Sequence, residues 1–180
     1  VTEALTVHGL HLKGVLLTHS HFDHVAGVPE IIQRFPGLPI WVHPLDQHRL
    51  RSPKYQGANF APVGDGARLT LGEAGTEPLE ILHCPGHTAG ELSVFWNHAD
   101  GPFLFTGDTL FIRDCGRTDL ETGDDTQMFD TLQRLKKLPL STVILPGHHY
   151  QPEVASRLEA ELHSSPPLQC QTVDELRSLP

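Results

Sequence analysis

Three histidines and one aspartate crowd into the seven residues that follow a short apolar run. Residues 15–17, Val-Leu-Leu, predict a buried strand, and residues 18–24, Thr-His-Ser-His-Phe-Asp-His, begin where that strand ends. Imidazole and carboxylate groups are the ligands of zinc and similar first-row metals. The first two histidines can bind one metal, whereas the aspartate and third histidine, beyond the bend, can face a second. The stretch predicts a metal site used for chemistry, with ligands His19, His21, Asp23 and His24.

Three later segments repeat this arrangement of an apolar run, a glycine and a ligand-type side chain. Residues 79–82 lead into a Gly-bracketed turn, residues 103–105 into Thr-Gly-Asp, and residues 143–145 into Pro-Gly-His. A single histidine or aspartate after glycine is usually a turn residue, but three cases beside the first cluster argue against coincidence. We expect four strand ends to converge on one rim and to bring His87, Asp108 and His148 to the first cluster.

The HxHxDH run of residues 19–24, followed in order by these three side chains, resembles the metallo-β-lactamase superfamily over nearly the whole chain. The resemblance implies an α/β fold, the αβ/βα sandwich, with the site at one edge of the paired sheets. It also implies a complete dinuclear site. The ligands would be His19, His21 and His87 for the first metal, Asp23, His24 and His148 for the second, and Asp108 bridging both.

The start of the chain departs from the family pattern. Superfamily members usually begin with several strands before the helix that precedes the histidine cluster, whereas residue 1 here falls inside that helix. We therefore expect a sandwich that lacks the usual first N-terminal strands, either as a fragment of a longer protein or with an incomplete first sheet. Losing those strands would expose a sheet edge and part of the core.

Length and residue pattern predict one domain over residues 1–180, with residues 163–180 as a short C-terminal extension. Helix and strand periodicities alternate along the chain, and no linker divides it. We expect helices over 2–8, 25–35, 125–138, 153–162 and 173–177, strands over 15–17, 40–43, 68–71, 79–82, 92–96, 103–105 and 143–145, and a loop over 52–67.

Charge and composition limit the classes of binding partner and the cellular location that we expect. The formal net charge is −9 with 13 Lys and Arg residues, which disfavours binding to nucleic acid, because phosphate backbones need basic contacts. No stretch approaches the roughly 20 apolar residues of a membrane span, so no membrane partner is expected. Cys84, Cys115 and Cys170 are odd in number and far apart, which favours reduced thiols and a cytoplasmic location.

The ligand set and the resemblance imply a metal-dependent hydrolase that acts through a hydroxide bridging two divalent ions. Such ions lower the pKa of bound water from about 15.7 toward about 7. Zinc is the expected metal, with iron or manganese as alternatives. Asp108 and Asp23 are the expected catalytic carboxylates, the first bridging the metals and the second orienting the hydroxide or taking its proton. An aspartate at position 108 argues against a β-lactamase, since those enzymes generally carry Cys or Ser there.

A thioester is the expected substrate, because a thiolate leaves without a strong general acid. The segments around Asp108, Cys115-Gly116-Arg117 and His148-His149-Tyr150 are similar to glyoxalase II-like hydrolases, the hydroxyacylglutathione hydrolases. In that family a basic residue at the place of Arg117 and a tyrosine at that of Tyr150 hold glutathione. The resemblance thus implies a small-molecule thioester or glutathione conjugate bound by these two side chains. In the family a long helical domain completes the glutathione site, and we expect no counterpart of it within residues 1–180, because about thirty residues follow Tyr150.

The sequence leaves a second enzyme class open. Residues 112–119 also resemble the persulfide (sulfur) dioxygenases of the superfamily, which use a single iron held by the positions of His19, His87 and Asp108. That triad is contained in the larger ligand set, so spacing does not separate the two readings. Pro146-Gly147-His148 follows the hydrolase pattern, and we therefore favour the hydrolase. A metal-binding protein without enzyme activity is disfavoured because no ligand is lost.

Overall fold

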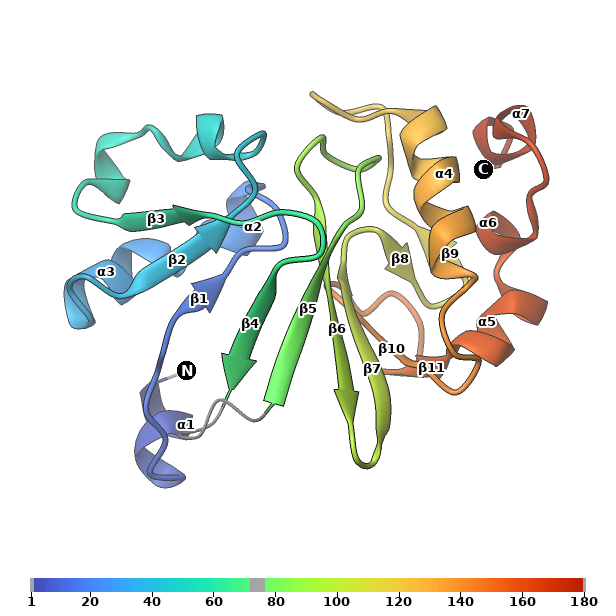
Figure 1. Ribbon diagram of the computed structural model, residues 1–180. Coiled ribbons are helices and arrows are strands. Elements are labelled where there is room, and N and C mark those ends of the chain that lie inside the picture. The colour runs from blue at the N-terminus through green and yellow to red at the C-terminus, as the bar shows by residue number, and fades with distance from the viewer. Residues whose placement is uncertain (1, 72–76, 180) are drawn as a thin grey trace.

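The computed structural model describes residues 2–71 and 77–179, so residues 1, 72–76 and 180 of the expected domain lie outside the described part. Two sheets of unequal size face each other (Figure 1). The smaller sheet is parallel throughout and has the order β1-β2-β3. Its strands are β1 (Val15–Leu16), β2 (Pro39–Val42) and β3 (Asn59–Pro62).

The larger sheet has the strand order β11-β10-β7-β6-β5-β4. Only β7 and β10 are parallel within it, and the register pairs Pro146 with Gly107. The residues that follow these two strands therefore leave the sheet at the same edge. The strands are β4 (Arg68–Leu71), β5 (Glu77–His83), β6 (Leu92–His98), β7 (Gly101–Gly107), β10 (Val143–Pro146) and β11 (Ser156–Arg157).

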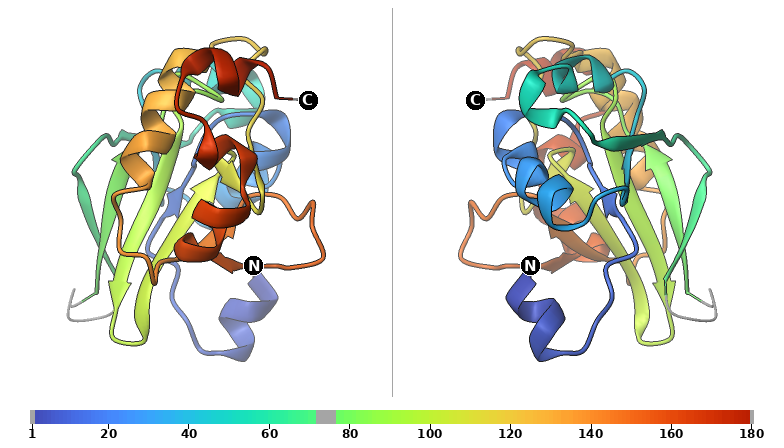
Figure 2. Two further views of the ribbon diagram at one scale, coloured as in Figure 1. Left: turned by 90° about the vertical axis from the view of Figure 1, so that its right-hand side faces the viewer. Right: turned by 90° about the vertical axis from the view of Figure 1, so that its left-hand side faces the viewer.

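Three apolar clusters fill the spaces between four layers. Between the sheets, Ile81, Leu92 and Val94 of the larger sheet pack with Leu16 and Trp41 of the smaller one. A second cluster lies between the smaller sheet and its helices, and a third between the larger sheet and the C-terminal helices. The helices thus cover the outer faces of both sheets (Figure 2). This is the αβ/βα sandwich expected from the sequence.

The helix expected over residues 25–35 is two helices, α2 (Phe22–Val25) and α3 (Val28–Arg34). Gly27 is the N-cap of α3 and Pro29 lies in its first turn, where the missing proline N–H cannot continue the hydrogen bonds of α2. The break leaves α2 as a single turn that starts directly after His21. Asp23 and His24 are therefore held on a short helix next to the end of β1.

The expectation of a loop over residues 52–67 was wrong. This segment contains a 3-10 turn, η2 (Pro53–Tyr55), and the whole of β3, which pairs Phe60 with Ile40 of β2. Asn, Ala and Pro give β3 a weak strand pattern, so pairing and packing decide its conformation. A second 3-10 turn, η1 (Gln47–Leu50), follows β2.

The C-terminal elements also differ from the expected pattern. The helix α4 (Asp125–Leu135) ends earlier than expected, and the helix expected over residues 153–162 is the short strand β11 followed by α5 (Leu158–Ser164). Two short helices come next, α6 (Pro166–Gln169) and α7 (Val173–Arg177), of which α6 was not expected. Apolar residues of α5, α6 and α7 pack in one cluster with α4. The expected C-terminal extension is thus part of the core.

The N-terminal helix α1 (Thr2–Val7) lies within the expected range of 2–8 and is closed at Gly9, whose φ is +61°. The strand after it, β1, is an edge strand of the smaller sheet. A small hairpin, β8 (Leu110–Phe111) and β9 (Asp114–Cys115), was not expected. Among residues 2–71 and 77–179, no helix has the length and apolar character needed to cross a bilayer.

Candidate metal centre

All seven predicted ligands lie at one edge of the sandwich. The first two follow β1, the next two lie on α2, His87 is in the turn between β5 and β6, and the last two follow β7 and β10. Their ligand atoms form three overlapping groups within which every pair lies within 4.8 Å. The groups are His19, His21 and His87; His19, His24 and Asp108; and Asp23, His24 and His148.

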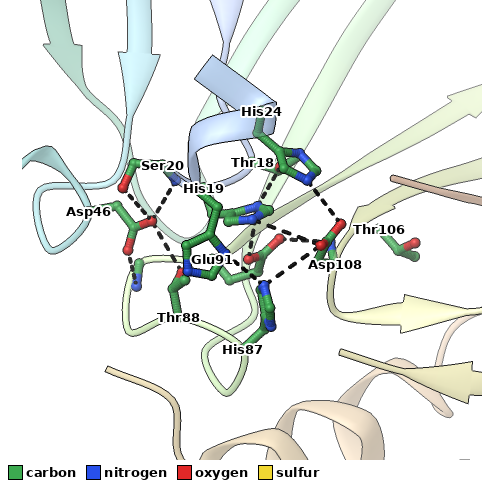
Figure 3. Close-up of polar contacts among 12 residues, drawn as sticks. Thr18, His19, Ser20, His24, Asp46, His87, Thr88, Glu91, Thr106 and Asp108 are labelled. Carbon is green, nitrogen blue, oxygen red and sulfur yellow. Dashed lines mark hydrogen bonds and ion pairs between the residues drawn. The ribbon is translucent and has the colours of Figure 1, made fainter. Parts of the chain in front are cut away.

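Asp108 contacts four of the predicted ligands, and Figure 3 shows it beside three of them, His19, His24 and His87. Its Oδ1 is 3.3 Å from His24 Nε2, and its Oδ2 is 3.3 Å from His148 Nε2. The same Oδ2 is 3.7 Å from His87 Nε2 and 4.0 Å from His19 Nε2. Two atoms that bind one tetrahedral zinc at about 2.1 Å lie about 3.4 Å apart. The separations between Asp108 and the four histidine nitrogens, 3.3 to 4.0 Å, are close to this value.

The ligands divide into two ends on either side of Asp108. At one end His21 Nδ1 faces His87 Nε2 at 3.0 Å. At the other end His24 Nε2 faces His148 Nε2 at 3.1 Å, and Asp23 Oδ2 is 3.3 Å from the same His148 atom. Ring nitrogens that face each other this closely suit a cation shared between their lone pairs.

The protonation states also suit metal binding. Burial, reinforced by the neighbouring His24, lowers the pKa of His19 to about 4, and burial together with His19 lowers that of His21 to about 4. Both imidazoles are therefore neutral at pH 7. The Nε2 atom of His19 is buried and has no hydrogen-bond partner among the described residues. An unpaired buried nitrogen of a neutral imidazole that faces Asp108 fits a metal ligand.

The Nδ1 atoms of His87 and His19, which face away from Asp108, contact other groups of the protein. His87 Nδ1–H donates to the carbonyl oxygen of Arg117 at 2.7 Å. His19 Nδ1 lies 3.2 Å from Thr18 Oγ1 and 3.2 Å from Glu91 Oε2. Partners of this kind fix the tautomer and ring orientation of metal-binding histidines. They turn Nε2 of both rings toward the centre.

The buried carboxylate of Asp46 joins the loop after β1 to the loop before β6. Its Oδ2 accepts hydrogen bonds from the Ser20 backbone N–H at 2.9 Å and from the hydroxyls of Ser20 and Thr88 at 3.2 Å each. Its Oδ1 accepts from the Gly90 N–H at 2.9 Å. Sequence reasoning missed Asp46, because a lone aspartate in a loop carries no sign of partners 26 and 44 residues away.

Sequence reasoning also missed Glu91, which is fully buried beside the ligands. Burial raises the pKa of its carboxyl group to about 8. The one sequence signal was a charged residue directly before the apolar residues of β6 and four positions after His87.

Two glycines allow the chain to pass close to the carboxylates of Glu91 and Asp108. Gly107 has a φ of +53°, and a Cβ atom there would overlap the carboxylate of Glu91 and lie 2.7 Å from Thr18 Cβ. A Cβ at Gly147 would lie 2.5 Å from Asp108 Oδ1. Glycine is needed at both positions because no side chain fits.

A family model, the metallo-β-lactamase superfamily, matches residues 2–148. The chain belongs to this superfamily. The match spans all seven predicted ligands, and the His/Asp cluster is consistent with the use of divalent metal in the family.

Individual relatives place the chain more closely within the superfamily. It is 36% identical over 152 residues to a hydroxyacylglutathione hydrolase of Hamiltonella defensa subsp. Acyrthosiphon pisum, a match that covers 83% of this chain and 53% of the relative. The chain thus spans about half the length of the curated relatives it matches. Among solved structures, ETHE1 from Myxococcus xanthus has a TM-score of 0.79 and 26% identity, covering 99% of this chain and 75% of that one. TTHA1623 in a di-iron-bound form has a TM-score of 0.74 and 30% identity, covering 92% and 82%.

The two predicted substrate-binding side chains of this superfamily member are both exposed. The Tyr150 ring is stacked on that of His148, with centroids 5.4 Å apart and an interplanar angle of 17°, and meets Phe111 edge-on at 5.0 Å. Arg117 contributes its carbonyl to His87, while its guanidinium forms a bidentate ion pair with Asp119 at 2.6 and 2.7 Å. Tyr150 thus borders the ligand set directly, whereas the Arg117 side chain points to a surface carboxylate.

Proposed function

We propose that this chain is a metal-dependent hydrolase of thioesters, of the hydroxyacylglutathione hydrolase type. It would bind two divalent ions, for which zinc is the preferred metal. The observation that carries the proposal is the complete ligand set with Asp108 in contact with ligands of both ends. We assign His19, His21 and His87 to the first metal, Asp23, His24 and His148 to the second, and Asp108 to both. When bound, such ions acidify a water molecule and polarise a carbonyl group.

The two carboxylates of the set differ in exposure, which supports different roles. The side chain of Asp23 is 39% exposed, whereas that of Asp108 is 9% exposed. Asp108 is enclosed by histidines that together lower its pKa, although burial acts in the opposite direction. We assign Asp108 to holding the two ends together. Asp23 is open to solvent beside His148, so we assign it to orienting a water molecule and accepting its proton.

Tyr150 and Arg117 are the side chains that we assign to substrate. The Tyr150 ring is stacked on that of His148, and its hydroxyl can donate a hydrogen bond to the substrate. Arg117 can bind a carboxylate in bidentate fashion, as it already does with Asp119. A glutathione conjugate carries carboxylates that could exchange with Asp119. A thioester fits this site because its thiolate leaves without a strong acid.

Two further parts of the proposal concern the chain as a whole. We propose that residues 1–180 form one domain, since α5, α6 and α7 share an apolar cluster with α4 and the larger sheet. We also propose a cytoplasmic location, which rests on the free thiols of Cys84, Cys115 and Cys170.

The test is hydrolysis of an acyl-glutathione thioester by the zinc-loaded chain. The rate is measured from the free thiol that the reaction releases. We expect equal rates under argon and in air, because hydrolysis uses no oxygen. Asp108→Ala and His148→Ala should each abolish the activity. No thiol release by a folded protein that carries two zinc ions per chain would reject the proposed reaction.

A second candidate function is a persulfide dioxygenase with a single iron. Its triad of His19, His87 and Asp108 is assembled, with the two Nε2 atoms 4.0 and 3.7 Å from Asp108 Oδ2. Such an enzyme should tolerate loss of His148 far better than loss of His19. Oxygen uptake with glutathione persulfide by the iron-loaded chain, together with negligible thioester hydrolysis, would favour this candidate.

A further inference from the structure

Glu91 contacts two predicted ligands at once. Its Oε1 accepts a hydrogen bond from the backbone N–H of Asp108 at 3.0 Å, and its Oε2 lies 3.2 Å from His19 Nδ1 (Figure 3). The side chain is fully buried, with a relative exposure of 0%. The Oε1 contact is a hydrogen bond from a backbone donor. Oε2 has no hydrogen bond among the described residues and lies against the His19 ring nitrogen.

The contact with His19 determines which nitrogen of the ring can bind a metal. When Glu91 is ionised, its oxygen at Nδ1 favours the tautomer with the proton on Nδ1, which leaves the lone pair on Nε2. Thr18 Oγ1, also 3.2 Å from Nδ1, is compatible with the same tautomer. The unpaired Nε2 then faces Asp108.

The contact with Asp108 fixes the backbone that carries the central carboxylate. Asp108 follows Gly107, whose positive φ turns the chain sharply as it leaves β7. The Glu91 oxygen receives the N–H directly after this turn. A Cβ atom at Gly107 would overlap the same carboxylate, so the glycine is the residue that admits Glu91.

We propose that Glu91 is a positioning residue that couples the two metal sites, because one carboxylate orients a ligand of the first metal and the peptide of the ligand shared by both. Glu91 is not itself a ligand. The inference rests on the proposed metal centre and is independent of the reaction that the centre catalyses.

The isosteric variant Glu91→Gln tests this directly. Both contacts of Glu91 require an acceptor, but the amide of glutamine offers one oxygen and one NH₂ group. Whichever way the amide is turned, an NH₂ group faces either the Asp108 N–H or His19 Nδ1. The volume of the side chain is unchanged, so the variant alters polarity alone.

The matched control is Glu161→Gln. Glu161 is another buried glutamate, with a relative exposure of 1%, and its Oε2 accepts a hydrogen bond from the Arg113 N–H at 2.6 Å. Glutamine can preserve that bond through its amide oxygen. Glu161 lies on α5, and the donor of this hydrogen bond, Arg113, is not a predicted ligand.

The measurement is zinc affinity by competition with a chromophoric chelator, together with long-range ¹H–¹⁵N NMR of the imidazoles. We expect Glu91→Gln to weaken zinc binding by about 10- to 100-fold at both sites and to shift the ¹⁵N resonances of His19. Glu161→Gln should bind zinc as the unmodified chain does. Unchanged affinity at both sites and unchanged His19 resonances in Glu91→Gln would overturn the proposal.

The unmodified chain gives a second test that needs no variant. Its His19 resonances should show a proton on Nδ1 both with and without zinc at a pH above about 8, where Glu91 is ionised. A proton on Nε2 in the zinc-free chain would overturn the role of Glu91 even if Glu91→Gln failed to fold. A chain that binds no zinc at all would instead reject the metal centre itself.

Discussion

His148 Nε2 lies 3.3 Å from Asp108 Oδ2 because the strands that carry these residues are parallel neighbours. The residues are 40 positions apart in the sequence, and α4 provides the connection between their strands. Parallel pairing brings both strand ends to one edge, where each delivers one ligand.

Replacing His148 should therefore remove one end of the site and spare the other. We expect His148→Ala to reduce the zinc content from about two ions per chain to about one, since His19, His21 and His87 remain together. Elemental analysis of the dialysed protein measures this directly. His149→Ala is the control, because the neighbouring His149 side chain is exposed and outside the three ligand groups. A wild-type content near one ion that added zinc does not raise would contradict the dinuclear model.

Replacing Arg117 should weaken substrate binding more than catalysis. We expect Arg117→Ala to raise KM for an anionic thioester roughly tenfold and to change kcat by less than about twofold, because charge-assisted hydrogen bonds contribute about 1.5–3 kcal/mol to binding. The backbone carbonyl that holds His87 is retained in this variant. Arg68→Ala, an exposed arginine on β4, serves as the control. Loss of kcat with an unchanged KM would assign Arg117 to the transition state or to structure.

Asp46 should stabilise the fold even without metal. In Asp46→Asn one of the backbone N–H groups of Ser20 and Gly90 must face an NH₂ group. An unsatisfied buried donor costs about 1–3 kcal/mol, so we expect the free energy of unfolding to fall by about 2 kcal/mol. Urea denaturation in the presence of a chelator measures this. Asp100→Asn, where the side chain is 84% exposed, should change it by less than about 0.5 kcal/mol.

The ion pair of Asp65 predicts a small pH-dependent contribution. Burial acts against ionisation of Asp65, but the His83 N–H and Arg134 outweigh it and lower the pKa of the carboxyl group. A lowered folded-state pKa stabilises the fold above the unfolded pKa, and this stabilisation is lost as the pH falls through the folded value. The Asp65 side chain is 51% exposed, so solvent screening keeps the effect below about 1 kcal/mol.

The measurement compares the urea midpoints of Asp65→Asn and the unmodified chain between pH 7 and pH 3. We expect a lower midpoint for the variant at pH 7 and a shrinking difference toward acid. Arg134→Gln should reduce the same difference, because its Nη2 lies 2.8 Å from Asp65 Oδ1. A difference that grows toward acid would show that the sign is wrong.

The predicted ligands could be selected from the sequence because they follow strand ends: four follow β1, and one each follows β5, β7 and β10. An apolar run that ends in glycine and a ligand-type residue is a local pattern, and the structure brings all the residues selected in this way to one edge. Local patterns also located the strands that carry them. The αβ/βα sandwich was predicted through the family resemblance that those same residues established.

Features that depend on distant partners could not be predicted. Asp46 and Glu91 can be buried because they accept hydrogen bonds from donors on other loops. No neighbouring residue in the sequence indicates these donors. The strand β3 exists because it pairs with β2, and α5 begins after β11 pairs with β10, although the sequence there favoured a loop and a longer helix. In each case tertiary pairing decided against local propensity.

The predicted ligands come from both halves of the sandwich: residues 19–24 follow the smaller sheet, whereas His87, Asp108 and His148 follow strands of the larger one. Bound metal would therefore cross-link the two halves of the sandwich. Since binding to the folded state alone adds RT ln(1 + [M]/Kd), each tenfold rise in free metal above Kd should add about 1.4 kcal/mol per site to stability. Resistance of the chain to unfolding would then report the metal supply around it.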